Sequence, residues 1–130
     1  MMKNKEIYDA ALNLIAEPMD EARVADYTIR APYLLGNFLC ENASLDAAYR
    51  KFKLLEPIEY PNSVYADLES DFYLSERFAP AAGYYVASML VIDEYGELAD
   101  KLFDLYSTAM SKISSEIPGA SEKLSIFTDR

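Results

Sequence analysis

Residues 75–117 read SERFAPAAGYYVASMLVIDEYGELADKLFDLYSTAMSKISSEI and contain two consecutive helical segments. The first has no charged side chain over residues 78–92, and a helix that is apolar on every side must be surrounded by protein or lipid. The second carries its charges on one face, so its apolar stripe can cover the first. We therefore predict a central apolar helix at about 75–93, packed by an amphipathic C-terminal helix at about 97–117. The apolar stripe of the second helix consists of Leu98, Leu102, Leu105, Ala109 and Ile113.

Two shorter helices are predicted upstream of this pair. Asn4 can cap a helix that runs to about Glu17, because its side chain can accept a hydrogen bond from the amides of the first turn. Apolar residues follow it at steps of three and four, as expected for one face of a helix. Ser44 can cap a short helix at 45–52 in the same way.

A longer helix between these two is predicted from segment 24–38, where apolar residues again recur every three or four positions. Pro32 lies inside this pattern and removes one backbone donor, so we expect it to kink the helix or to split it near Arg30. Taken together, the patterns predict one all-α domain, residues 1–130, built as a small bundle of four to five helices.

Two segments lack a sustained helical period. Residues 53–73 include Pro57 and Pro61, and we predict a flexible loop there. Residues 119–130 follow the helix-ending Pro118 and are predicted to form a loosely held tail that could dock on a neighbouring subunit. The apolar residues of this tail are Leu124, Ile126 and Phe127.

The charge balance of the chain argues against nucleic acid as a ligand. The chain has 12 basic and 22 acidic residues, a net charge of −10, whereas binding to phosphates requires Lys and Arg to displace counterions. Cys40 is the only cysteine, which excludes an internal disulfide. The N-terminus lacks a signal-peptide pattern, and the uncharged run at 78–92 is shorter than the ~20 residues of a membrane span. We expect a cytoplasmic protein with no membrane association.

The sequence offers few residues for catalysis or metal binding. Histidine is absent, which excludes triads that use imidazole and, with a single cysteine, a zinc site. The acidic segment 67–71 lacks the glycine and the terminal glutamate of a calcium-binding loop, and we interpret it as a solvated turn. We therefore expect no catalytic residue, no cofactor, no metal and no small-molecule substrate. An enzyme using carboxylates alone would need a deep pocket with two converging acids.

Six residues are candidates for structural or interface roles. Arg30 and Arg77 precede apolar helical segments, where a guanidinium is costly unless it is paired. We predict ion pairs with acids such as Asp26, Glu76 or Asp93; the alternative is that both side chains extend to solvent along their apolar stems. The eleven tyrosines suit surfaces that are apolar on one side and wet on the other. The aromatic interface candidates are Tyr65, Tyr73, Tyr106 and Phe127.

Three passages carry a resemblance to a known family: KEIYDAALNLIAE, ADYTIRAPYLLGNFLCE and LSERFAPAAGYYVASMLVIDEYGELADKLFDLYSTAMSKI. They are similar to the small helical head–tail connector, or adaptor, proteins of tailed bacteriophages and prophages. In the third passage, Arg77 leads into an Ala- and Tyr-rich helix, an acidic turn and a long amphipathic helix with Tyr106 in its middle. The resemblance does not extend to residues 53–71.

The resemblance implies a non-catalytic subunit of a ring that joins the portal to the tail in the virion. Such a subunit would self-associate and would contact portal and tail proteins, while DNA passes nearby without specific binding. A negatively charged bore would repel the genome and let it slide. The alternative reading is an acidic helical adaptor or regulatory protein that binds a basic protein partner.

Overall fold

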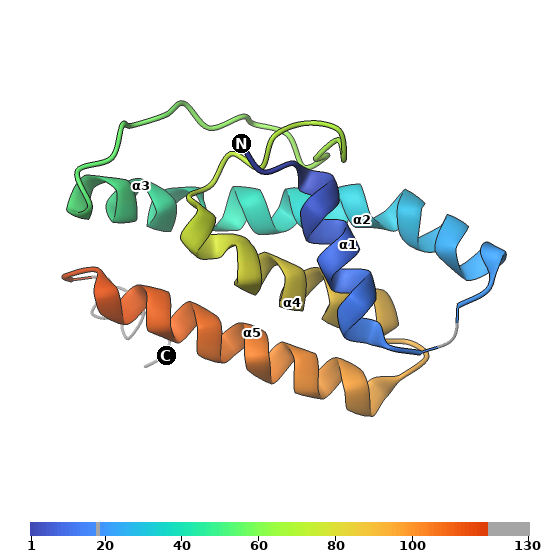
Figure 1. Ribbon diagram of the computed structural model, residues 1–130. Helices are drawn as coiled ribbons and strands as arrows, with labels where there is room; N and C mark the ends of the chain where they lie inside the picture. Colours follow the sequence, from blue (N-terminus) through green and yellow to red (C-terminus); the bar gives the residue numbers. More distant parts are fainter. Residues whose placement is uncertain (18, 120–130) are drawn as a thin grey trace.

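A computed structural model of the protein describes residues 1–17 and 19–119, and it confirms the all-α prediction (Figure 1). Over these ranges the chain forms five α-helices that pack against each other, with one isolated antiparallel bridge between Lys3 and Asp71 in place of any strand. None of the helices in this part of the chain is both long and apolar enough to cross a lipid bilayer. The elements are α1 (Asn4–Ile15), α2 (Glu21–Glu41), α3 (Ala43–Phe52), the short 3-10 helix η1 (Glu76–Phe78), α4 (Ala79–Val91) and α5 (Gly96–Glu116).

Helix α4 is the centre of the bundle, as the uncharged sequence predicts. It packs against α1, α2 and α5. It lies between α5 and the consecutive helices α2 and α3, which we call the α2–α3 rod (Figure 1). Its small residues allow the neighbouring helices to approach closely, and the hydroxyl of Ser88 donates to the carbonyl of Ala99 in α5 at 3.1 Å. The buried residues of α4 are Ala81, Ala82, Gly83, Val86, Ala87, Ser88, Leu90 and Val91.

The first turns of two helices differ from the prediction. α4 begins at Ala79, behind η1, because Pro80 fits the first turn of a helix, where its missing N–H would have no helical partner. Lys3 rather than Asn4 caps α1. Asn4 is buried, and its side-chain amide donates to the carbonyl of Asp67 at 2.9 Å. The Asn4 side chain therefore bonds to a residue far along the chain instead of making the predicted capping hydrogen bond within α1.

Pro32 does not split α2, which runs without interruption from Glu21 to Glu41. A proline inside a helix destabilises it by roughly 3 kcal/mol. Burying each large apolar side chain stabilises the fold by about 1.5–3 kcal/mol. The carbonyl of Pro32 accepts a hydrogen bond from the amide of Ala66 at 2.9 Å. The face of α2 that packs into the core therefore holds the helix together, and its buried apolar residues are Tyr27, Ala31, Leu35, Phe38 and Leu39.

Asn42 joins α2 to α3, because it is at once the C-cap of the first helix and the N-cap of the second. The short helix begins at Ala43 and not after a Ser44 cap. Beyond it, residues 53–75 form the α3–α4 loop, which passes back along the α2–α3 rod to reach α4 (Figure 1). The loop supplies acceptors for the first amides of α1: Asn4 donates to Ser70 and Lys5 donates to Leu68.

Helix α5 covers α4 over the predicted range, with one error in the predicted stripe. Leu105 is 47% exposed, whereas Ala99, Leu102 and Ile113 are buried. Tyr106 lies beside the buried face in place of Leu105 and packs partly against the core. An α-helix has 3.6 residues per turn, so residue 106 lies on the same face as residue 102 just as well as residue 105 does.

Candidate functional site

The polar groups that the structure brings together serve mainly to hold the bundle. In residues 1–17 and 19–119, no three His, Cys, Asp or Glu side chains gather as a metal site would require. In the acidic segment 67–71, the Asp67 carboxylate accepts from the amide of Glu69 at 2.8 Å. Asp71 forms an ion pair with Lys3 at 3.0 Å. This segment closes a turn and fastens the N-terminus to the α3–α4 loop.

Arg30 fastens α2 to the C-terminal end of α4. It pairs with Asp26, one of the predicted partners, at 3.4 Å, and it donates to the carbonyls of Met89 at 3.1 Å and Leu90 at 3.4 Å. A cation is favourable there, because the last carbonyls of a helix lack helical donors and carry partial negative charge. Arg30 is half-buried, and these contacts are all made within the subunit.

Arg23 makes a second connection at the same end of the bundle. Its guanidinium pairs with Glu94 at 2.7 Å, donates to the hydroxyl of Tyr95 at 2.9 Å and lies over the Tyr95 ring at 5.3 Å. No local pattern points to this residue, because its partners are about seventy positions away. Arg23 ties the turn between α4 and α5 to α2.

Arg77 pairs with Glu116 and not with the predicted neighbour Glu76. Its Nε and Nη2 atoms donate to one carboxylate oxygen at 2.9 and 2.5 Å. This hydrogen-bonded guanidinium lowers the pKa of the Glu116 carboxyl. The partners are 39 residues apart, so spacing along the chain could not reveal them. The contact joins η1 to the last turn of α5.

Asp46 is a fully buried carboxylate at the base of the α3–α4 loop. It accepts from Arg50 Nε at 2.7 Å, from the hydroxyl of Tyr60 at 2.5 Å and from the amide of Ser75 at 2.8 Å. Burial alone raises the pKa of Asp46, but these hydrogen bonds outweigh it and the pKa is lowered. No local pattern in the sequence marks Asp46, since only the conformation of the loop that covers it makes position 46 internal.

The Asp46 cluster also determines the environment of two tyrosines. Burial, followed by the hydrogen bond to Asp46, raises the pKa of Tyr60 to about 12. Tyr73, a predicted interface residue, is half-buried, and burial raises its pKa to about 12. Its ring packs edge-on against Tyr60 at 6.0 Å, while its carbonyl accepts from Arg50 at 3.0 Å. Both carboxylate oxygens accept hydrogen bonds, Oδ1 from Ser75 and Oδ2 from Arg50 and Tyr60, so the cluster anchors the loop.

Tyr65 belongs to an exposed apolar patch on the outer side of α2. Its ring packs edge-on against Tyr33 of α2 at 5.1 Å, and the two side chains are 49% and 53% exposed. The loop can lie this close to α2 only because residue 36 is glycine: a Cβ there would be 1.8 Å from the carbonyl oxygen of Val64. We call this surface the α2 patch, and it consists of Ile29, Tyr33, Val64 and Tyr65.

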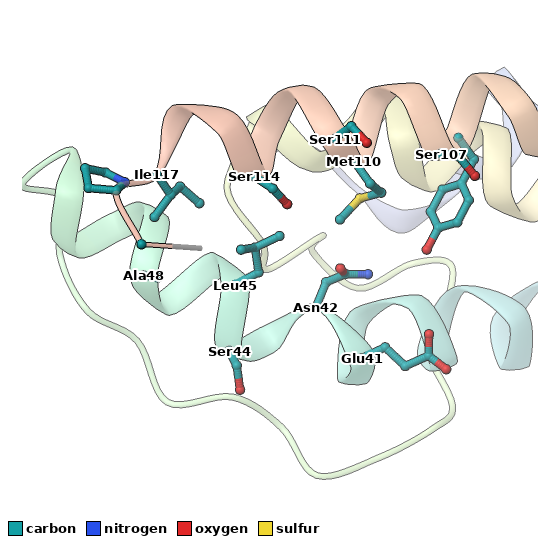
Figure 2. A pocket seen from close by; sticks show the side chains of 13 residues that line it. Glu41, Asn42, Ser44, Leu45, Ala48, Ser107, Met110, Ser111, Ser114 and Ile117 are labelled. Atoms are coloured by element: carbon teal, nitrogen blue, oxygen red, sulfur yellow. The ribbon is translucent and has the colours of Figure 1, made fainter. Parts of the chain in front are cut away.

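Tyr106 lies at one end of a groove between α3 and the C-terminal half of α5, with a volume of about 640 Å³. Its ring contacts Phe38, Tyr85 and Phe103. Figure 2 shows Leu45 and Met110 pointing into the space between the two helices and Ile117 facing Ala48. We call this feature the α3–α5 groove, and its lining also includes Glu41, Asn42, Ser44, Ser107, Ser111, Ser114, Pro118 and Gly119.

The groove and the α2 patch are both apolar surfaces. Among the described residues that line it, the groove has apolar walls, several serines and one carboxylate, that of Glu41. The interface candidate Phe127 lies outside the described residues. Comparison of the chain with protein-family models, curated proteins and solved structures finds no match. Any inference about function must therefore come from the fold, the α2 patch and the α3–α5 groove.

Proposed function

We propose that the chain is a head–tail connector subunit of a tailed bacteriophage or prophage, a non-catalytic protein that joins portal and tail during virion assembly. One observation supports this most directly: two unlike apolar surfaces are exposed on one small bundle. The α2 patch includes part of the α3–α4 loop, and the groove is bordered by α5. The loop and α5 lie on opposite sides of α4 (Figure 1).

In a ring of identical subunits, each subunit uses two different surfaces, one for each neighbour. When one patch of a subunit binds a different patch of the next copy, the contact is head-to-tail, and a suitable rotation closes the chain of subunits into a ring. A symmetric dimer, in contrast, would need only one self-complementary patch. Additional exposed apolar residues lie on α5 and at or just after the end of α3, namely Phe52, Leu54, Leu55, Phe103 and Leu105.

The charge of the chain fits the same proposal. A ring of subunits that each carry −10 would present a negative lumen to the DNA, and phosphate repulsion would keep the genome from adhering. Partners would therefore be further copies of this chain and the portal and tail proteins, with no small-molecule substrate. The protein would be found in the bacterial cytoplasm before assembly and in the virion afterwards.

Electron microscopy of the chain mixed with a phage portal protein tests the proposal. We expect rings on the portal, and at least a tenfold loss of ring formation in a Tyr33→Asp/Tyr65→Asp variant, because the new charges would be buried at the subunit contact. Val24→Asp is the matched control, since Val24 is also an exposed apolar residue of α2 but lies outside the α2 patch. Circular dichroism checks that all three proteins are folded.

The neighbouring genes provide an independent test. Portal, major capsid and tail genes beside this one would support the connector, whereas metabolic or regulatory neighbours would contradict it. A stable small complex with a basic protein, and no ring on any portal, would favour the adaptor alternative.

A further inference from the structure

The α3–α5 groove opens where the described chain ends. Pro118 and Gly119 line one end of it, and the sequence continues from there with ASEKLSIFTDR, residues 120–130. We propose that this C-terminal segment binds in the α3–α5 groove of its own subunit, with Leu124 and Ile126 against its apolar wall. The inference goes beyond the connector proposal and does not rest on it; in a ring, a neighbouring subunit that used the groove would have to displace the segment.

The segment is long enough to follow the groove to its far end. From Gly119 back to Tyr106 the groove follows 13 residues of chain, most of them helical, or about 20 Å at 1.5 Å per residue. Seven extended residues, from Gly119 to Ile126, span roughly 23 Å. Gly119 has φ +83°, the left-handed conformation with which glycine commonly turns the chain after a helix. A return along α5 therefore begins at the residue where the groove begins.

The chemistry of the segment matches that of the groove. Alternate residues of an extended chain face the same side, so Leu124 and Ile126 can both face the wall formed by Leu45, Met110 and Ile117 (Figure 2). The serines of the groove can bond to the backbone of the bound segment. The segment has two acids and two bases, a sum of zero, so the whole −10 belongs to residues 1–119. A neutral segment can approach this acidic body without added repulsion.

Attachment favours the chain's own groove over that of a second copy. A short flexible connection gives an effective concentration in the millimolar range, far above the micromolar concentrations at which the isolated subunit would be studied. Burial of two aliphatic side chains then suffices to keep the segment bound, because the connection has already removed most of the translational freedom.

Disulfide crosslinking of the full-length chain tests this placement. In a Cys40→Ser background, Leu124→Cys, which five extended residues bring to the level of Met110, is combined with Met110→Cys in the groove or, as a control, with Lys112→Cys. Lys112 is two residues along α5 and exposed outside the groove. We expect the intramolecular disulfide to form at least tenfold faster with position 110 than with position 112. Adding Ile126→Asp to the 110/124 pair should remove most of this advantage, while circular dichroism verifies the fold.

Mixing isotopically heavy and light chains before oxidation distinguishes the two possible acceptors. Products that link heavy to light would place the segment in a second copy and overturn the proposal. Equal rates at positions 110 and 112 would also overturn it, because they would mean that the segment is free. Neither result depends on ring formation, so a failure here leaves the connector proposal standing, and the reverse also holds.

Discussion

Helix α4 and the α3–α4 loop are held in place by different interactions. α4 is uncharged, mostly buried and fixed by apolar contacts with three helices. Most residues of the loop are exposed, and it is fixed by hydrogen bonds to Asp46, to Arg50 and to the first residues of the chain. Apolar periodicity predicts only the first kind of order. A segment without periodicity can still have a defined path when buried polar groups anchor it.

Val86→Asp is the strongest test of whether apolar contacts hold α4 in place. Val86 is buried in α4, and an unpaired buried carboxylate costs several kcal/mol, comparable with a total stability of about 5–15 kcal/mol. We expect the variant to be unfolded by circular dichroism at neutral pH. Ile92→Asp, at an exposed position just beyond α4, should remain folded. A cooperative unfolding transition in Val86→Asp would contradict the central role of α4.

On the polar side, Asp46→Asn should destabilise the fold by about 3 kcal/mol, because it leaves the Arg50 guanidinium without its buried partner. Asp9→Asn is the matched control: Asp9 and Lys5 form an ion pair of the same i,i+4 spacing on an exposed face of α1. Urea denaturation should show little change for the control. Equal effects in the two variants would mean that the buried carboxylate does not anchor the loop.

The dependence of stability on acidic pH should also show the contribution of the Asp46 carboxylate. The pKa of Asp46 is lowered by folding, so its contribution to stability is present above the unfolded value of about 3.9 and is lost as pH falls through the folded value. The wild-type chain should therefore lose more stability than Asp46→Asn as the pH falls below about 4. Urea midpoints measured at several pH values check this, and parallel curves would count against it.

Two helical glycines provide a comparison of opposite sign. Gly36→Ala in α2 would place a Cβ on the Val64 carbonyl of the loop, and we expect a loss of about 1–3 kcal/mol from overpacking. Gly83→Ala in α4 would meet only a methyl carbon of Leu14 at 3.9 Å. There we expect a gain of up to ~1 kcal/mol from higher helix propensity. Thermal unfolding of the two variants measures both, and two losses of equal size would contradict the difference.

The smallest expected effect appears at alkaline pH. The pKa of Tyr60 and that of Tyr73 are each raised to about 12, first of all by burial. Their contribution to stability is present below the unfolded value of about 10 and is lost as pH rises from about 10 to about 12. Absorbance near 295 nm should show these two phenols ionising last, and Tyr60→Phe should remove one of the late steps.

The sequence predicts the helices of this protein better than it predicts the contacts between them. The uncharged run of α4 and the one-sided charges of α5 depend only on local spacing, and both predictions are confirmed. Of the predicted kink or split at Pro32, the split does not occur, and a local rule could not foresee this because it cannot weigh the buried face of the same helix. Asp46 and the partner of Arg77 were missed because each depends on residues distant in the chain.

Neither of the two apolar surfaces could be assembled from the sequence. Tyr65 and Tyr106 were singled out as aromatic residues of a chain rich in tyrosine, without knowledge of what lies beside them. The α2 patch depends on the loop crossing Gly36, and the groove depends on the separation of α3 from α5. Pattern reasoning therefore found some members of each surface but not the surface itself.

Asn42 makes the length of the α2–α3 rod intolerant to change. Because one residue both ends α2 and starts α3, an inserted residue that extends the helix would rotate everything beyond it by about 100°. Asp46 would then turn away from Tyr60 and Ser75, and Leu45 would leave the groove wall. Insertions here should be far more harmful than insertions of the same size between Pro57 and Pro61, where the chain is exposed.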